Sequence, residues 1–172
     1  MKNTIEHCFE SEKIVSLYCD AQNTESHYTG YINAYNQNEI VISHITANGS
    51  YDGYILRRID DIYRIDYDGS YERKIDKLYR LRKQKHDRIP SSKELFFSIV
   101  NYAKENRLIL SFYFEGSYIT GLILNYNNDS VLVNCINDDG QCNGVSSVLI
   151  DNISYVELDT ENEQSLSLLY FD

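Results

Sequence analysis

The chain has 172 residues and a formal net charge of −10, which argues against a protein that coats nucleic acid, because neutralising phosphates requires Lys and Arg. Its hydrophobic content of 42% is typical of a globular protein and excludes general disorder. No segment approaches the roughly 20 apolar residues of a membrane helix, and the first residues lack the apolar core of a signal peptide. The four cysteines have no close spacing, so we expect reduced thiols in a cytoplasmic protein.

The pattern of the first half predicts a helix, five short strands and a second helix. Residues 3–12 place Ile5, Cys8 and Phe9 on one helical face. Residues 70–83 predict the second helix, which is strongly basic. Between them, apolar alternation separated by polar or glycine-bearing turns predicts strands over residues 13–18, 28–34, 39–45, 53–58 and 62–67.

The second half predicts the same order of elements. Pro90 ends the preceding segment, Ser91 and Ser92 offer a helix cap, and residues 94–104 have the apolar spacing of a helix on a core. An acidic segment, residues 161–170, is the weaker counterpart of the basic helix. The strands between them are predicted over residues 108–114, 118–125, 130–136, 145–149 and 153–158.

The two halves are copies of one another. Residues 29–68 match residues 120–159 at an offset of 91, with 12 identities in 40 aligned positions. Glycines and apolar alternation that recur at one offset indicate one fold made twice. We therefore expect a mainly β protein with helices, in two domains of residues 1–88 and 89–172. Each domain is expected to be a small, bent, five-stranded antiparallel barrel with an N-terminal and a C-terminal helix.

The glycines, turns and apolar strands of each copy resemble the two motifs of the Sm-like family. In the second copy these are Gly116, Gly121, Tyr126 with Asn127, the apolar run 131–133, and residues 148–156. In the first copy they are Gly30, Tyr35 with Asn36, and residues 59–62. The resemblance covers about 110 of the 172 residues, and it is to a tandem Sm-like protein of bacterial or phage type.

The resemblance implies tandem Sm-like barrels whose turns clasp RNA bases. The turn positions that it implies are Tyr35, Asn36, Asn38, Tyr126, Asn127 and Asn128. The chain departs from the family at Asp60 and Asp61 and at Asp151 and Asn152, which stand where the family has Arg-Gly. Asparagine in a hairpin turn also has a purely structural role, because its side chain binds the turn backbone.

The basic residues are concentrated in one stretch. Residues 57–93 hold 12 of the 16 basic residues against 7 acidic ones, a local net charge of +5, so the remainder of the chain has −15. Such asymmetry is typical of a binding stripe or of a solvated basic helix. If RNA binds, we expect it on Arg57, Arg58, Arg73, Lys77, Arg80, Arg82, Lys83 and Lys85, with Tyr51, Tyr54 or Tyr63 as stacking surfaces.

No catalytic, metal or cofactor motif is present in the sequence. The four histidines have no metal-ligand spacing, and no phosphate-cradling loop or nucleophile elbow occurs. We therefore expect a non-enzymatic binding or regulatory module of tandem Sm-like type, which acts on RNA or a protein partner and forms a possible homo-oligomer. The alternative is a protein-interaction adaptor, or an acidic inhibitor of a basic partner, that docks through the acidic remainder or through open strand edges. A third interpretation is a small-ligand sensor with its site between the copies.

Overall fold

The computed structural model describes residues 1–90 and 93–172, so the helix cap expected at Ser91 and Ser92 lies outside the described residues. In the first half the elements are α1 (Lys2–Glu10), β1 (Ile14–Tyr18), β2 (Tyr28–Tyr35), β3 (Glu39–Ile45), β4 (Tyr51–Arg58), β5 (Arg64–Tyr67) and α2 (Ser70–Leu81). In the second half they are α3 (Leu95–Asn106), β6 (Leu110–Phe114), β7 (Ser117–Tyr126), β8 (Ser130–Ile136), β9 (Cys142–Leu149), β10 (Tyr155–Leu158) and α4 (Glu161–Phe171). A single turn of 3₁₀ helix links β4 to β5 (Ile59–Asp61) and β9 to β10 (Ile150–Asn152).

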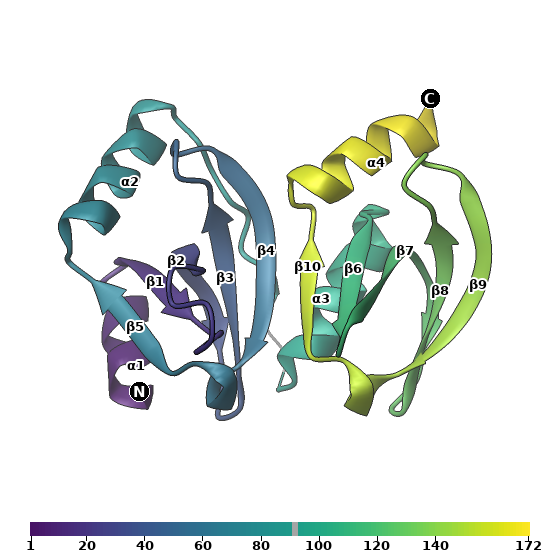
Figure 1. Cartoon of the computed structure of the whole chain (residues 1–172), viewed down its shortest axis with the longest axis horizontal. Coiled ribbons are helices and arrows are strands. Elements are labelled where there is room, and N and C mark those ends of the chain that lie inside the picture. Colours follow the sequence, from purple (N-terminus) through teal and green to yellow (C-terminus); the bar gives the residue numbers. More distant parts are fainter. Residues whose placement is uncertain (91–92) are drawn as a thin grey trace.

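The strands form one open antiparallel sheet of ten strands, in the order β5-β1-β2-β3-β4-β10-β6-β7-β8-β9. The prediction of two five-stranded barrels is therefore wrong. A barrel in the first half would close β4 against β5, but β4 pairs with β10 of the second half, as Figure 1 shows at the centre of the molecule. β5 pairs with β1 and ends the sheet on the other side. The division of the chain at residues 88 and 89 stays a prediction.

Helix α3 joins the two halves. It packs on β7 of its own half and also on β3 and β4 of the first half. The largest cluster of buried side chains accordingly contains Val41 and Tyr54 from the first half together with Ile99, Phe112 and Val156 from the second. Burial of apolar surface is the main stabilising term in folding, so the two halves share one hydrophobic core across their junction.

A buried carboxylate anchors the terminal helix of each half to the first strand. The Ser16 hydroxyl on β1 donates to Oε1 of Glu72 on α2 at 2.6 Å, and the Ser111 hydroxyl on β6 donates to Oε1 of Glu163 on α4 at 2.5 Å. Both carboxylates are buried, and hydrogen bonds to a charged group are stronger than neutral ones. The repeat seen in the sequence thus extends to the polar contacts inside each half.

Among the described residues, no helix has both the length and the apolar character needed to cross a membrane.

Candidate functional site

The pairing of β4 with β10, here called the seam, is where the two halves meet. Leu56 lies opposite Val156 and Tyr54 opposite Leu158. The side chain of Tyr54 is only 2% exposed, because α3 and β10 cover it. The seam is therefore a paired strand-to-strand interface with a buried apolar side rather than a loose contact between domains.

Gly53 allows the end of β10 to approach β4 closely. Its φ is +67°, and a Cβ at this position would lie 2.2 Å from the carbonyl oxygen of Leu158. Beside it, the Tyr51 hydroxyl donates to the Asp159 carboxylate at 2.6 Å, and the Glu161 amide donates to Oδ1 of Asp52 at 2.7 Å. These contacts fasten the end of β10 to the start of β4.

Arg57 stabilises the seam on the side of the sheet opposite Leu56. Its guanidinium carbon lies 3.8 Å from the centroid of the Tyr155 ring, and Nη2 donates to the Tyr28 hydroxyl at 3.3 Å. Tyr155 in turn stacks on Tyr113 at 4.2 Å. A cation over an aromatic face is attractive when both are shielded from water, so Arg57 contributes to the contact between the halves.

Strand β9, at the other end of the sheet, is the copy of β4 and has no strand on its outer edge (Figure 1). Val145 stands 91 positions after Tyr54 and is 58% exposed; Leu132 on β8 stands 91 positions after Val41 and is 37% exposed, against 1% for Val41. Gly144, the copy of Gly53, keeps a positive φ of +85°, but apart from its chain neighbours no heavy atom of the described residues lies within 4 Å of where its Cβ would be. β9 therefore has the features of one side of a seam, without the strand that would cover it.

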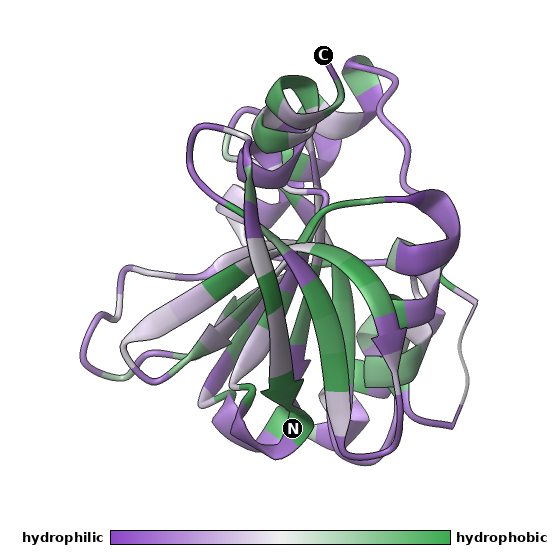
Figure 2. Cartoon of the chain, turned by 90° about the vertical axis from the view of Figure 1, so that its right-hand side faces the viewer, coloured by the Kyte–Doolittle hydropathy of each residue, from purple (hydrophilic) through white to green (hydrophobic). Residues whose placement is uncertain are grey.

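The surface next to β9 is apolar and unprotected. Figure 2 views the molecule from this side, where hydrophobic segments recur along the strands that face the viewer. β9 has no charged residue from Cys142 to Leu149, although edge strands in proteins are commonly protected by charges. The exposed apolar side chains on β9 and on the neighbouring β8 are Leu132, Val145 and Leu149, and Leu124 on β7 is also exposed.

Strand β5, at the opposite end of the sheet, is the copy of β10. Tyr67 stands 91 positions before Leu158 and is 39% exposed. Asp68, which follows β5, has a φ of +59°, close to the +56° of Asp159, which follows β10. The sheet thus ends on one side with β5, a strand shaped like β10, and on the other side with β9, a strand shaped like β4.

The structure does not bring the predicted nucleic-acid residues together on one surface. Arg57 lies in the seam, and Arg58 donates to the carbonyl of Ile153 at 3.3 Å, both near the end of β4. The start of β4 lies beside the segment that follows α2, because the Tyr51 amide donates to Gln84 at 2.9 Å. The remaining six lie on α2 or just after it, at the other end of β4, and are exposed: Arg73, Lys77, Arg80, Arg82, Lys83 and Lys85.

The asparagines at the expected Sm-type turns hold the turns themselves. Oδ1 of Asn36 accepts the amides of Asn38 and Glu39 at 2.8 and 2.7 Å. Oδ1 of Asn127 likewise accepts the amides of the second and third residues after it, both at 2.8 Å. Both are local Asx turns. Of the other positions, Tyr35 packs on Phe9, the Tyr126 hydroxyl donates to Asn101, and Asn128 is exposed.

Of the three tyrosines proposed as stacking surfaces, Tyr54 is buried in the seam and Tyr51 is half-buried beside it. Only Tyr63 has a ring substantially open to solvent. In the described part of the chain, no group of three or more His, Cys, Asp and Glu side chains could hold a metal ion. All four cysteines, Cys8, Cys19, Cys135 and Cys142, are free thiols.

The sequence predicted open strand edges as a docking surface in the alternative function, but it did not identify β9 as the open edge. Gly53 and Gly144 are identical at the repeat offset, and this was the available signal, because a glycine kept in both copies needs a backbone reason. The exposure of Leu132 and Val145 gives no signal in the sequence, since both fit an ordinary strand.

No protein-family profile matches the chain, and no curated protein or solved structure matches it either. Neither the open sheet nor these comparisons support the descriptions of the chain as a barrel protein, as RNA-binding or as bacterial. The resemblance to the Sm-like family itself stays a prediction.

Proposed function

We propose that the protein is a non-enzymatic protein-interaction module that assembles head to tail, with the β9 edge of one chain pairing with β5 of a second copy. The observation that supports this is the seam: the two strands that form it have copies, β9 and β5, at the two ends of the same sheet, and the outer edge of each is unpaired among the described residues. An interface between two different surfaces of identical chains is heterologous and generates rings or filaments. Kinship with Sm-like proteins and a cytoplasmic location, which the free thiols favour, belong to the same proposal.

The repeat specifies the register of the proposed pairing. Leu158 lies opposite Tyr54 in the seam, so Tyr67 of one chain is expected opposite Val145 of the next. Val145 is 58% exposed and Tyr67 is 39% exposed, so completing the burial of each one contributes about 1 kcal/mol, a part of the roughly 1.5–3 kcal/mol for a fully exposed side chain. Helix α1 of the incoming chain would then cover Leu132, as α3 covers Val41 in the seam.

The first test is the mass of the particle in solution. Multi-angle scattering on a size-exclusion column should give a mass for the natural chain that rises above 20.1 kDa with concentration. Val145→Asp places a charge in the proposed interface and should return the mass to that of one chain. Leu81→Asp is the matched control, because Leu81 is 69% exposed on α2, away from both edges.

Two outcomes would overturn the proposal. One is a natural chain that stays at 20.1 kDa at every concentration, and the other is a Leu81→Asp variant that dissociates as fully as Val145→Asp. If the natural chain stays a single molecule, the partner of the uncharged β9 edge is not a second copy of this chain.

The second test is the register, measured by disulfide trapping in chains that carry Cys142→Ser. Mixing a Tyr67→Cys chain with a Val145→Cys chain should give a covalent dimer under mild oxidation, because paired strand positions have the Cα separation that a disulfide requires. A Tyr63→Cys chain provides the control, since Tyr63 is exposed but precedes β5. Equal trapping with both chains would contradict the proposed register.

A further inference from the structure

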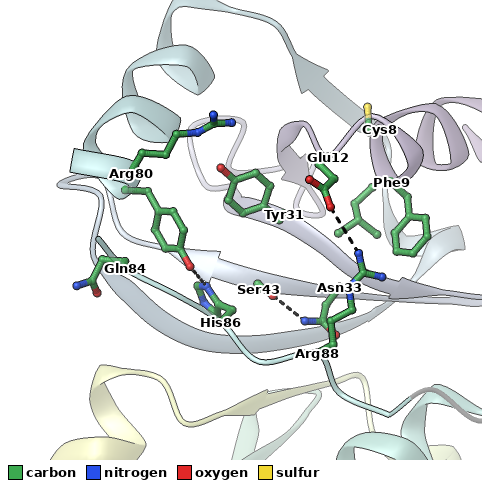
Figure 3. Close-up of a pocket in the computed structure, with 12 residues that line it drawn as sticks. Cys8, Phe9, Glu12, Tyr31, Asn33, Ser43, Arg80, Gln84, His86 and Arg88 are labelled. Atoms are coloured by element: carbon green, nitrogen blue, oxygen red, sulfur yellow. Dashed lines mark hydrogen bonds and ion pairs between the residues drawn. The ribbon is translucent and has the colours of Figure 1, made fainter. Parts of the chain in front are cut away.

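A cavity of about 390 Å³ lies in the first half, away from the open edge, and its lining residue His86 also packs on Tyr51 beside the seam. It is enclosed by α1, the strands β2 and β3, α2, and the segment that connects the halves (Figure 3). Its volume falls within the roughly 300–1,000 Å³ typical of small-molecule sites. The residues that line it are Cys8, Phe9, Glu12, Tyr31, Ile32, Asn33, Ser43, Tyr79, Arg80, Gln84, His86 and Arg88.

The wall formed by the connecting segment is held in place by hydrogen bonds. Nδ2 of Asn33 donates to the Ser43 hydroxyl and to the carbonyl of Asp87, both at 2.9 Å. The ring of His86 is bonded through Nδ1 to the Tyr79 hydroxyl at 2.7 Å and through Nε2 to a carbonyl of β3 at 2.9 Å. Both ring nitrogens therefore have partners, and the cavity is formed before any ligand arrives.

The lining combines an apolar surface with two cations from different elements. Ile32, which is buried, and Phe9 contribute apolar surface to the lining. Arg80 on α2 and Arg88 on the connecting segment lie on opposite sides of the labelled lining residues (Figure 3). Arg80 donates through Nε to Oδ1 of Asp76 on the same helix at 2.8 Å, which leaves its Nη groups for a ligand. Arg88 is 3.9 Å from the Glu12 carboxylate, which is a weak contact between exposed groups, and its guanidinium lies 5.1 Å from the Phe9 ring centroid.

The second half shows that the fold does not require this lining. At the repeat offset, Tyr31 corresponds to Leu122, and Asn33 corresponds to Leu124. Arg80, with its cation, corresponds to the apolar Phe171. The same arrangement of strands and helices is thus built with apolar residues at these positions. In the first half, Asn33 holds the connecting segment and Tyr31 donates to Asp76 on α2, so both have structural roles. Arg80 makes an exposed i,i+4 ion pair with Asp76, which contributes little to stability, so folding explains its cation least.

We propose that this cavity binds a small amphipathic anion. Its carboxylate, sulfonate or phosphate group lies between Arg80 and Arg88, since guanidinium groups bind such oxygens in a bidentate manner. Its planar apolar body lies against Phe9, Ile32 and Tyr31. The site does not depend on assembly of the chain, because every lining residue comes from one half of one molecule.

The test uses two probes that differ in one group: 8-anilinonaphthalene-1-sulfonate and its neutral analogue N-phenyl-1-naphthylamine. Titration of the full chain followed by ¹H–¹⁵N correlation spectra should move the amides of Tyr31, Ser43 and His86. The sulfonate should bind at least about ten-fold more tightly than the neutral probe, since a hydrogen bond between two charged groups is stronger than one between neutral groups.

The matched variants are Arg80→Ala with Arg88→Ala, and Lys77→Ala on the same helix as Arg80. The double variant should weaken sulfonate binding about ten-fold, while Lys77→Ala, an exposed residue outside the lining, should leave it unchanged. The proposal is overturned if the two probes bind equally. It is also overturned if the double variant retains full affinity, or if the moved amides cluster around Leu132 and Val145 on the open edge.

Discussion

Replacing each of the two equivalent glycines with alanine separates two losses of stability: the strain of a side chain at positive φ, and the steric clash that the seam adds. Both Gly53 and Gly144 have positive φ, +67° and +85°, and a side chain in that conformation costs about 1–2 kcal/mol. At Gly53 the added methyl group would also lie 2.2 Å from the Leu158 carbonyl oxygen. Ordinary van der Waals contact needs roughly 3.5 Å, so β4 and β10 must separate by about an ångström.

Overpacking of this kind costs about 1–3 kcal/mol. We therefore expect Gly53→Ala to lower the free energy of unfolding by about 2–5 kcal/mol, and Gly144→Ala by only about 1–2 kcal/mol. Urea unfolding followed by circular dichroism, at concentrations where the chain is a single molecule, measures both values. Equal losses for the two variants would refute the close approach of β10 to Gly53.

The same pair also bears on assembly. A methyl group on Gly144 points to where the end of an incoming β5 would lie, so Gly144→Ala should weaken association even though it affects the fold little. Gly53→Ala should lower the free energy of unfolding more than Gly144→Ala does. It should weaken association of the folded chains less than Gly144→Ala does.

Two further predictions concern buried ionisable groups. Burial lowers the pKa of His86 to about 4, below the ordinary value of about 6.5, so the unfolded chain takes up a proton first as the pH falls. Stability is full above pH 6.5 and should fall by about 3 kcal/mol by pH 4, and the difference between the natural chain and His86→Gln in urea series over that range measures it. Glu163→Ala leaves the hydroxyl of Ser111 and the amide of Thr160, which donates at 3.0 Å, without their acceptor. It should therefore lower the free energy of unfolding by about 3 kcal/mol, whereas a loss below 1 kcal/mol, also measured in urea, would contradict a buried anchor.

The individual elements were predictable because their signals are local. The third strand of each half was expected over residues 39–45 and 130–136, and the structure has β3 and β8 with these bounds. Alternation of apolar residues fixes which side chains point inward, and the polar turns fix where strands stop. Helix α1 is shorter than expected, since it ends at Glu10, before Glu12 adopts a positive φ.

The pairing of strand edges was not predictable, because alternation specifies the faces of a strand and says nothing about which strand lies beside it. A strand such as β4 can close on its own half or pair with the other half with the same residues inward. The place of Arg57 in the seam was not predictable for the same reason. Its positive charge indicated nucleic acid, but its partner is the ring of Tyr155, which lies far along the chain and becomes a neighbour only through the seam.

The differences between the two halves indicate the function of the β9 edge better than their shared features do. In the first half, Val41 and Tyr54 are buried because the second half covers them. In the second half, Leu132 and Val145 occupy the same positions and remain apolar although they are exposed. An edge that only had to remain in water would be expected to carry charges against aggregation, and β9 has none. The absence of charge on β9 and the open space at Gly144 are therefore explained together if the edge is covered by a strand like β10, and β5 is the strand of that shape that each copy of the chain can provide.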